Sequence, residues 1–233
     1  MPKLGNAISK IDDPKLALSL RDRVLERIRA DIVSGRSGPG AMYSAPSLAS
    51  ELGISTTPVR EALLELSNRG MITPMRNRGF KVKASSLEDL EHLFEMRELL
   101  ERFATVKIAE AGLQDAEELN NLADAIAETV KDRDVQAYLG ADRAFHEAFV
   151  SRADNPRLTK TIMDLRDDMR LFGIDSAEGE ERQRESVKEH YQLIDLAAKG
   201  DARAIAPLIT KHILAWRPLF RRALAAKTER RPL

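Results

Sequence analysis

The feature that most constrains this fold is the long C-terminal segment, where every apolar pattern is helical. From Ser86 onward leucine and alanine recur at helical spacing, and no stretch shows the alternation of a strand. Breaks at Gly112, at the sequence ADNP, around residues 173–179 and at Gly200 separate the expected helices. These helices run over residues 86–111, 115–132, 134–152, 157–173, 180–199 and 201–226. The pattern predicts an all-α bundle of about six helices.

The first 84 residues follow a different pattern, made of short elements separated by glycine and proline. A helix is expected from Leu20 to a stop at Gly35, and a short strand in MYSA. Two short helices joined by a tight turn, typical of a helix-turn-helix, are predicted in PSLASELG and ISTTPVREALLELSNRG. A hairpin with a basic tip, or wing, is predicted in MITPMRNRGFKV. The fold class is therefore mainly α, with an N-terminal winged helix-turn-helix and a C-terminal helical bundle.

Charge separates the same two segments. Residues 15–83 hold 12 Lys and Arg against 6 Asp and Glu, whereas residues 84–233 hold 23 against 29. A basic module beside an acidic one indicates that the basic module meets a polyanion.

The second helix of the pair and the wing carry the candidate DNA contacts. Such a helix enters the major groove with its N-terminal residues at base edges, and a basic wing can reach phosphates or an adjacent minor groove. An arginine can fork onto guanine, whereas hydroxyls near a helix start more often hold phosphate. For Ser55 and Thr57 the alternative is helix capping, expected for at least one of them. The candidate contacts are Ser55, Thr56, Thr57, Arg60, Arg76, Asn77, Arg78 and Gly79.

Composition excludes several other kinds of protein. The chain contains no cysteine, which excludes disulfides, thiolate metal sites and a cysteine nucleophile. No apolar run approaches the roughly 18 residues of a membrane span. The N-terminus also lacks the apolar stretch of a signal peptide. We therefore expect a cytoplasmic protein with no membrane partner.

Histidines on apolar helix faces form a second candidate site. Asp142 and His146 lie four residues apart beside the aromatic stripe of DRAFHEAF, and His190 and His212 lie on apolar faces of their own helices. His92 is expected at the surface. Each inward histidine alone is compatible with a hydrogen-bonded core residue, but burying several without partners would cost on the order of 1–3 kcal/mol each. A divalent metal bound by the carboxylate and the three imidazoles would satisfy all of them. Such ligands suit zinc first, then nickel, iron or manganese, better than calcium.

Arg97 is a third polar residue directed into the bundle, in register with the apolar residues of its helix. A buried arginine needs an anion. One interpretation is an internal salt bridge with Glu101. The other is a carboxylate-bearing effector that Arg97 holds while another oxygen of the effector reaches the metal.

Both segments resemble one family. SxTPVREAL followed by xLxxxGMIxPxxNRGFxV resembles the winged helix of GntR-type bacterial transcription regulators. DRAFH, SRADNPRL and EHYQLIDLAAKGDARAIAPLITKHI are similar to the FCD effector domain of their FadR-like branch. This resemblance implies metal ligation by Asp142, His146, His190 and His212. The implied domains are a flexible tail (1–14), a winged helix-turn-helix DNA-binding domain (15–84), an all-α effector and metal-binding domain (85–227) and a C-terminal tail (228–233).

The resemblance also implies an effector, a small organic acid. It favours an effector contact for Arg97 and suggests one for Asn155, which otherwise reads as a helix cap. Many relatives carry Arg where this chain has Thr56, so their operator sequence does not carry over.

The expected function is therefore a homodimeric regulator whose two winged helices match half-sites on near-palindromic double-stranded operator DNA. Repression is the expected sign of regulation, and the sequence does not distinguish it from activation. Two alternatives remain open. A histidine-rich site with an open metal position could activate water in an enzyme, although no positioned general base is evident and a winged helix argues against it. A regulator without metal could instead bind its effector directly through the histidines.

Overall fold

A computed structural model describes residues 19–229 apart from 34, 85 and 170–172. The N-terminal elements are α1 (Leu20–Val33), β1 (Met42–Tyr43), α2 (Ala45–Leu52), α3 (Thr56–Asn68), β2 (Ile72–Met75) and β3 (Gly79–Val82). The strands form an antiparallel sheet in the order β1-β3-β2, in which Met75 pairs with Gly79. This is the predicted winged helix-turn-helix, and MYSA supplies its edge strand. The predicted tail at 1–14 lies outside the described residues.

Local sequence signals account for the helix pair. Ser44 caps α2 through its side chain, and Pro46 lies in the first turn, where its missing N–H costs nothing. Gly53 ends α2 in the left-handed conformation, which glycine adopts without strain. The inner faces of α1 and α3 form a separate core centred on Ile28, Ile32, Val59, Leu63 and Leu66.

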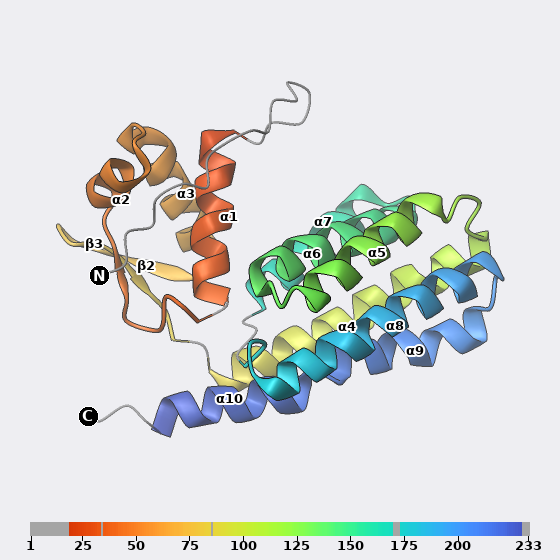
Figure 1. Cartoon of the computed structure of the whole chain (residues 1–233). Coiled ribbons are helices and arrows are strands. Elements are labelled where there is room, and N and C mark those ends of the chain that lie inside the picture. Colours follow the sequence, from red (N-terminus) through yellow and green to blue (C-terminus); the bar gives the residue numbers. More distant parts are fainter. Residues whose placement is uncertain (1–18, 34, 85, 170–172, 230–233) are drawn as a thin grey trace.

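The C-terminal part is an all-α bundle with a second core. Its helices are α4 (Leu87–Ala111), α5 (Glu117–Lys131), α6 (Val135–Ser151), α7 (Pro156–Asp168), α8 (Ala177–Ala198), α9 (Ala202–Leu214) and α10 (Arg217–Glu229). In Figure 1 the bundle lies beside the winged helix, with α4, α8 and α9 running alongside one another and α10 extending beneath. No helix among the described residues is both long and apolar enough to cross a membrane.

Two expected boundaries were wrong. The single helix expected over 201–226 is two helices, and Pro218 lies in the first turn of the second, where its missing N–H costs nothing. The helix expected to reach residue 173 ends at Asp168, because Met169 adopts an extended backbone and turns its side chain into the core. The bundle thus contains one more helix than expected within the described residues.

Candidate DNA-binding surface and metal centre

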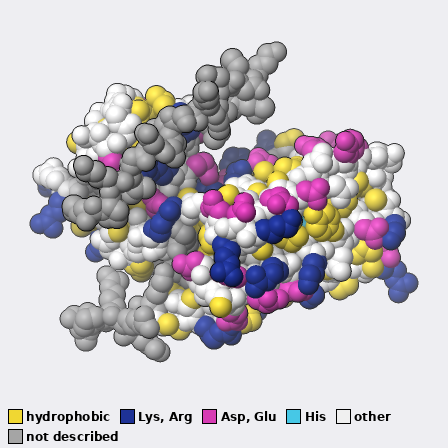
Figure 2. Space-filling view, in the orientation of Figure 1, with side chains coloured by type: hydrophobic (Ala, Val, Ile, Leu, Met, Phe, Trp, Pro, Cys, Tyr) yellow, Lys and Arg dark blue, Asp and Glu magenta, His cyan; other side chains and the backbone are white. Residues whose placement is uncertain are grey.

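A surface groove lies between the start of α3 and the wing. Its lining includes most of the candidate DNA contacts, namely Thr56, Thr57, Arg60, Asn77, Arg78 and Gly79. The α3 residues in this set are exposed, as is Arg78. Figure 2 shows basic side chains projecting at the wing end of the molecule. The winged-helix fold therefore brings recognition-helix and wing residues, about twenty positions apart in the chain, to one concave surface.

Two candidate residues outside that lining have different surroundings. Arg76 lies in the exposed turn between β2 and β3. Ser55 occupies the N-cap position of α3, but its side chain makes no capping hydrogen bond. Thr57 lies within the first turn of the helix. The expectation that at least one of these hydroxyls caps α3 was therefore wrong.

The wing turn depends on two residues with positive φ. Asn77 has φ 58°, a left-handed conformation that asparagine tolerates better than most residues. Gly79 has φ 96°, and a Cβ atom there would lie 2.2 Å from the backbone oxygen of Tyr43 on β1. Glycine at this position thus lets β3 approach β1, and the NRG sequence sets both the turn and the packing of the wing.

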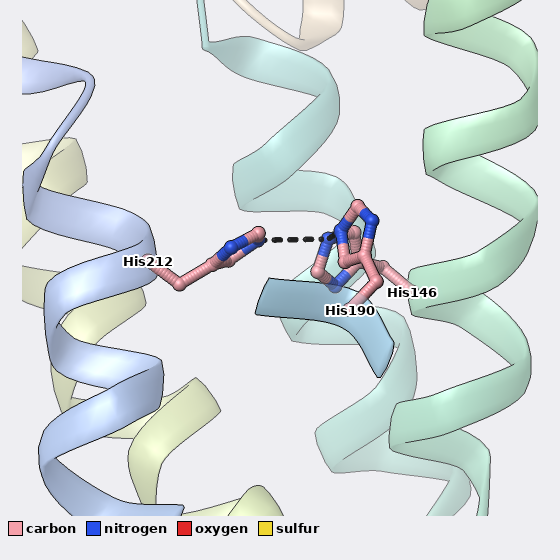
Figure 3. Close-up of side chains that lie close together, drawn as sticks. All are labelled: His146, His190 and His212. Atoms are coloured by element: carbon pink, nitrogen blue, oxygen red, sulfur yellow. Dashed lines mark hydrogen bonds between the residues drawn. The ribbon is translucent and has the colours of Figure 1, made fainter. Parts of the chain in front are cut away.

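The three inward histidines meet in the bundle core. His146 on α6, His190 on α8 and His212 on α9 are all buried, and Figure 3 shows their rings turned toward one another. The Nε2 atom of His146 lies 3.1 Å from that of His190 and 3.3 Å from that of His212. One ligand atom from each ring lies within 4.8 Å of the others. The exposed His92 takes no part, as expected.

These separations match a metal's ligand sphere. Zinc–nitrogen bonds are about 2.0–2.1 Å, so two nitrogens around one ion lie about 2.9 Å apart at a right angle and about 3.4 Å apart at a tetrahedral angle. In the absence of metal, a protonated ring nitrogen can donate a hydrogen bond to the neighbouring unprotonated nitrogen. The donor set, three imidazole nitrogens converging from three helices, fits a divalent metal.

Asp142 adds an oxygen beside two of the histidines. Its Oδ1 atom lies 3.5 Å from Nε2 of His190 and 3.7 Å from Nε2 of His146. Its Oδ2 atom accepts a hydrogen bond from Arg166 at 2.9 Å. Asp142 can therefore present one oxygen to a metal while the other remains anchored.

His212 is oriented by a carboxylate that the sequence interpretation missed. Its Nδ1 atom lies 2.9 Å from Oε2 of Glu189, which is buried and also paired with Arg182 and Lys211. A carboxylate accepts hydrogen bonds, so Nδ1 carries the proton and Nε2 offers its lone pair to the site. Glu189 directly precedes His190, but one glutamate among the many charges of α8 gives no sequence signal.

Burial keeps the two central rings neutral, the form that binds metal. Burial, reinforced by Arg166, lowers the pKa of His146 well below its usual value. Burial, together with neighbouring His212 and Arg166, does the same to the pKa of His190. Burial opposes ionisation of Glu189, but its hydrogen bonds to His212 and Arg182 prevail and lower its pKa to about 2. The site thus combines neutral imidazoles with an ionised supporting carboxylate.

A cavity opens beside this cluster. It is lined by His212 and Asp142, by the buried Arg97 and by Arg166, whose side chain is 11% exposed. Arg97 donates from Nε to Glu101 at 2.7 Å, and Arg166 donates to the other oxygen of the same carboxylate at 2.8 Å. Burial opposes ionisation of Glu101, but these two cations outweigh it and lower its pKa. The internal salt bridge of Arg97 therefore exists, in a side chain that also faces the cavity.

Asn155 lies elsewhere. Its side chain caps α7 by accepting a hydrogen bond from the backbone of Leu158 at 3.1 Å. It borders a separate surface pocket and not the described lining of the cavity beside the histidines. The geometry thus accounts for Asn155 as a cap, while Arg166 is a cavity residue that the sequence did not single out.

Comparisons with known proteins agree with this architecture. The family described as "Bacterial regulatory proteins, gntR family" matches residues 20–82, and "FCD domain" matches residues 92–215. An Nta operon transcriptional regulator of Aminobacter aminovorans is 30% identical over 184 residues, 78% of this chain and 85% of that protein. A probable D-xylose utilization operon transcriptional repressor of Paenarthrobacter nicotinovorans is 26% identical, over 86% of this chain and 88% of that one.

A solved structure shares the fold. McbR/YncC of Escherichia coli has a TM-score of 0.76 at 23% identity, covering 91% of this chain and 100% of that chain. The matched domains and relatives are transcriptional regulators, which decides against the enzyme alternative. The chain belongs to the GntR family of bacterial transcription regulators, with an FCD domain following its winged helix.

Proposed function

We propose that this regulator is a cytoplasmic homodimer that represses transcription by binding operator DNA, and that a small organic acid bound beside a divalent metal modulates this binding. The observation that carries the proposal is the convergence of three buried Nε2 atoms and Asp142 at the edge of a cavity containing Arg97. Relatives named as repressors, for D-xylose utilization and for the gluconate operon of Bacillus subtilis, support the sign of the regulation.

Operator binding is assigned to the groove between α3 and the wing. Within the described residues Arg60, Arg76 and Arg78 make no ion pair, so their charges are available to DNA. DNA fragments selected from a random library by the full-length protein provide the probe. Arg60→Ala should weaken binding to the selected fragment by about tenfold to a hundredfold, the value of one bidentate base contact. Arg203→Ala, an exposed arginine of α9, is the control. Unchanged binding by Arg60→Ala would remove this residue from the interface.

Metal ligation is assigned to Asp142, His146, His190 and His212, with zinc first and nickel, iron or manganese as the other candidates. A bound metal would supply an electrophilic position for an acid's oxygen, and the chain holds its ligands through Glu189 and Arg166. Protein purified without a nickel resin should contain about one metal per chain. Metal-free protein that still binds its acid and DNA normally would favour the alternative in which histidines contact the effector directly. Against that alternative, His146 and His190 are absent from the described lining of the cavity.

Effector binding is assigned to the cavity, where Arg97 and the metal would hold separate oxygens of one acid. A panel of small carboxylic acids screened by thermal shift tests this. An acid that raises the unfolding temperature of wild-type protein, but not of Arg97→Gln, supports the proposal. If no acid of the panel raises the unfolding temperature of the wild-type protein, the proposal that the effector is a small carboxylic acid is wrong. Asn155 remains a weaker candidate, because its side chain already serves as a cap.

Dimerisation is assigned to the outer face of α4. Met96, Leu99 and Phe103 form an apolar stripe at helical spacing, and their exposed fractions are 45%, 66% and 59%. Two copies of α4 packed antiparallel about Leu99 would bring Glu95 of one near Arg102 of the other, so the face complements itself. Phe103→Glu should yield a monomer with unchanged metal content in analytical ultracentrifugation. A dimer that survives this change would place the interface elsewhere.

A further inference from the structure

The cavity beside the histidines is not built from the helical bundle alone. Its lining includes Arg29, Ala30 and Val33, which lie on α1 of the DNA-binding domain. Leu139 of α6 also lines it and packs against the cores of both domains. One wall of the proposed effector cavity is therefore the first helix of the winged-helix domain.

Arg29 is held in that wall by a carboxylate of the bundle. Its Nη1 atom lies 3.0 Å from Oδ1 of Asp167 on α7, and its Nε and Nη2 atoms donate to Glu26. The Asp167 side chain is only 5% exposed. It also accepts two hydrogen bonds from Arg143, and Arg69 at the end of α3 lies 3.6 Å away. Asp167 thus joins two helices of the DNA-binding domain to α6 and α7.

The same two bundle helices connect this junction to the histidine cluster. Asp142 and Arg143 are consecutive on α6, and Arg166 and Asp167 are consecutive on α7. Asp142 accepts from Arg166 at 2.9 Å beside the histidines, and Asp167 accepts from Arg143 at 3.0 Å at the domain junction. The same two turns of α6 and α7 therefore carry one ion pair beside the histidines and one at the domain junction. A displacement of either helix at one pair would displace the other pair as well.

We propose that Arg29 is a ligand-binding residue of the cavity, contributed by the DNA-binding domain, and that Asp167 holds it until an acid competes for it. This rests on the proposed effector function. The acid carries at least two carboxylates, one reaching Arg97 and the metal side and a second reaching Arg29. The guanidinium of Arg29 has a limited number of N–H donors and already binds Glu26 and Asp167. The second carboxylate of the acid therefore weakens the ion pair between Arg29 and Asp167 and loosens α1 from α7. Ligand occupancy is thereby sensed directly by the domain that binds DNA.

Hydrogen exchange of full-length protein tests the role of Asp167 without any ligand. Asp167→Asn should accelerate exchange of α1 amides about tenfold, because a charged hydrogen bond across the junction is lost. Asp164→Asn is the matched control, an exposed aspartate one turn earlier on α7 that pairs with Lys160. Arg29→Gln removes the same bond from the other side and serves if Asp167→Asn does not fold. Equal exchange in Asp167→Asn and Asp164→Asn, or in Arg29→Gln and wild type, would overturn this role.

Succinate and citrate, with acetate for comparison, test Arg29 as a ligand residue. Each is titrated against wild type, Arg29→Gln and Arg27→Gln, an exposed α1 arginine that pairs with Glu51. Arg29→Gln should bind succinate or citrate about tenfold more weakly and acetate unchanged, while Arg27→Gln matches wild type. Wild-type α1 should exchange faster with succinate or citrate bound. Equal affinities in wild type and Arg29→Gln would overturn the inference alone. Failure of all the acids to bind wild type would overturn the acid-binding function, and this ligand role with it.

Discussion

The two arginine-rich regions of this protein differ in how their charges are compensated. In the DNA-binding groove, Arg60 and Arg78 are exposed and make no ion pair within the described residues. In the bundle, Arg97 is buried and Arg166 is largely buried, and both donate hydrogen bonds to Glu101. Water solvates the charge of an exposed arginine until a phosphate binds it. A buried arginine destabilises the fold unless a counter-charge lies beside it. The groove is thus ready for a polyanion, while a ligand of the cavity must compete with carboxylates already there.

Histidines mark the same contrast. All four lie in the C-terminal segment, after residue 84, and three are buried together. Metal and protons should therefore act on the stability of the bundle and leave the winged helix's own core unaffected. Each of the following changes should act mainly on one of the two domains, and its measured effect therefore tests that distinction.

The largest effect is expected for His190→Ala. At metal concentrations about a thousandfold above the dissociation constant, binding to the folded state stabilises by about 4 kcal/mol, and this gain should disappear. Differential scanning calorimetry with and without zinc gives the change, and His92→Ala, at an exposed histidine, is the control. If zinc still raises the unfolding temperature of the bundle in His190→Ala, the assignment of the metal centre is wrong.

Acid should destabilise the metal-free bundle. The pKa values of His146 and His190 are lowered in the folded state by burial, so the unfolded state binds more protons below its histidine pKa of about 6.5. Stability is complete above that value and falls as pH decreases, by about 3 kcal/mol for two histidines near pH 5.5. Urea unfolding of chelator-treated protein, followed by near-ultraviolet dichroism of the bundle's Trp216, gives the slope. A bundle whose stability is constant between these pH values would contradict neutral burial.

Gly79→Ala should affect the other domain. The added Cβ would lie 2.2 Å from the backbone oxygen of Tyr43, and alanine rarely adopts the φ of 96° found there. We therefore expect the free energy of unfolding of the winged helix to fall by about 2 kcal/mol. Gly38→Ala is the control, since nothing lies within 4 Å of its added Cβ. Operator affinity should fall with the loss of the wing, while metal content remains at the wild-type value. A parallel loss of metal would show that the two domains do not fold separately.

The smallest effect is expected for Glu189→Gln. The amide can still accept a hydrogen bond from His212 but lacks the charge that strengthens it, so metal affinity should fall about tenfold. Competition with a chelator measures the affinity, and Glu185→Gln, an exposed glutamate one turn earlier, is the control. Nitrogen NMR of His212 should show a changed tautomer balance in Glu189→Gln only. An unchanged affinity would leave Glu189 with a purely structural role.

Several parts of the fold were predictable because their signals are local. Proline and glycine at the ends of α2, and the apolar spacing of α3, predicted the helix-turn-helix, since such residues act within one or two turns. The NRG turn predicted the wing for the same reason. The division of α9 from α10 was not predictable in the same way, because apolar residues recur at helical spacing across residues 201–226 and a proline, Pro207, also lies inside α9.

The candidate sites divide in a similar way. Polar residues on otherwise apolar faces stand out, so Asp142, His146, His190 and His212 could be selected before their helices were placed. Glu189, Arg166 and Asp167 could not, because each is one charge among many on α7 and α8. Asp167 in particular gains its meaning from Arg29, which lies 138 positions earlier in the chain.

By itself, the sequence determined the two-part architecture, the wing and the identity of the four proposed metal ligands. These follow from periodicity and from residues whose chemistry conflicts with their immediate surroundings. Only the tertiary structure decided which charges are paired, which arginines face the cavity and that α1 forms one of its walls. The physical reason is that burial and ion pairing depend on side chains from distant segments of the chain. They are defined only once the helices have packed against one another.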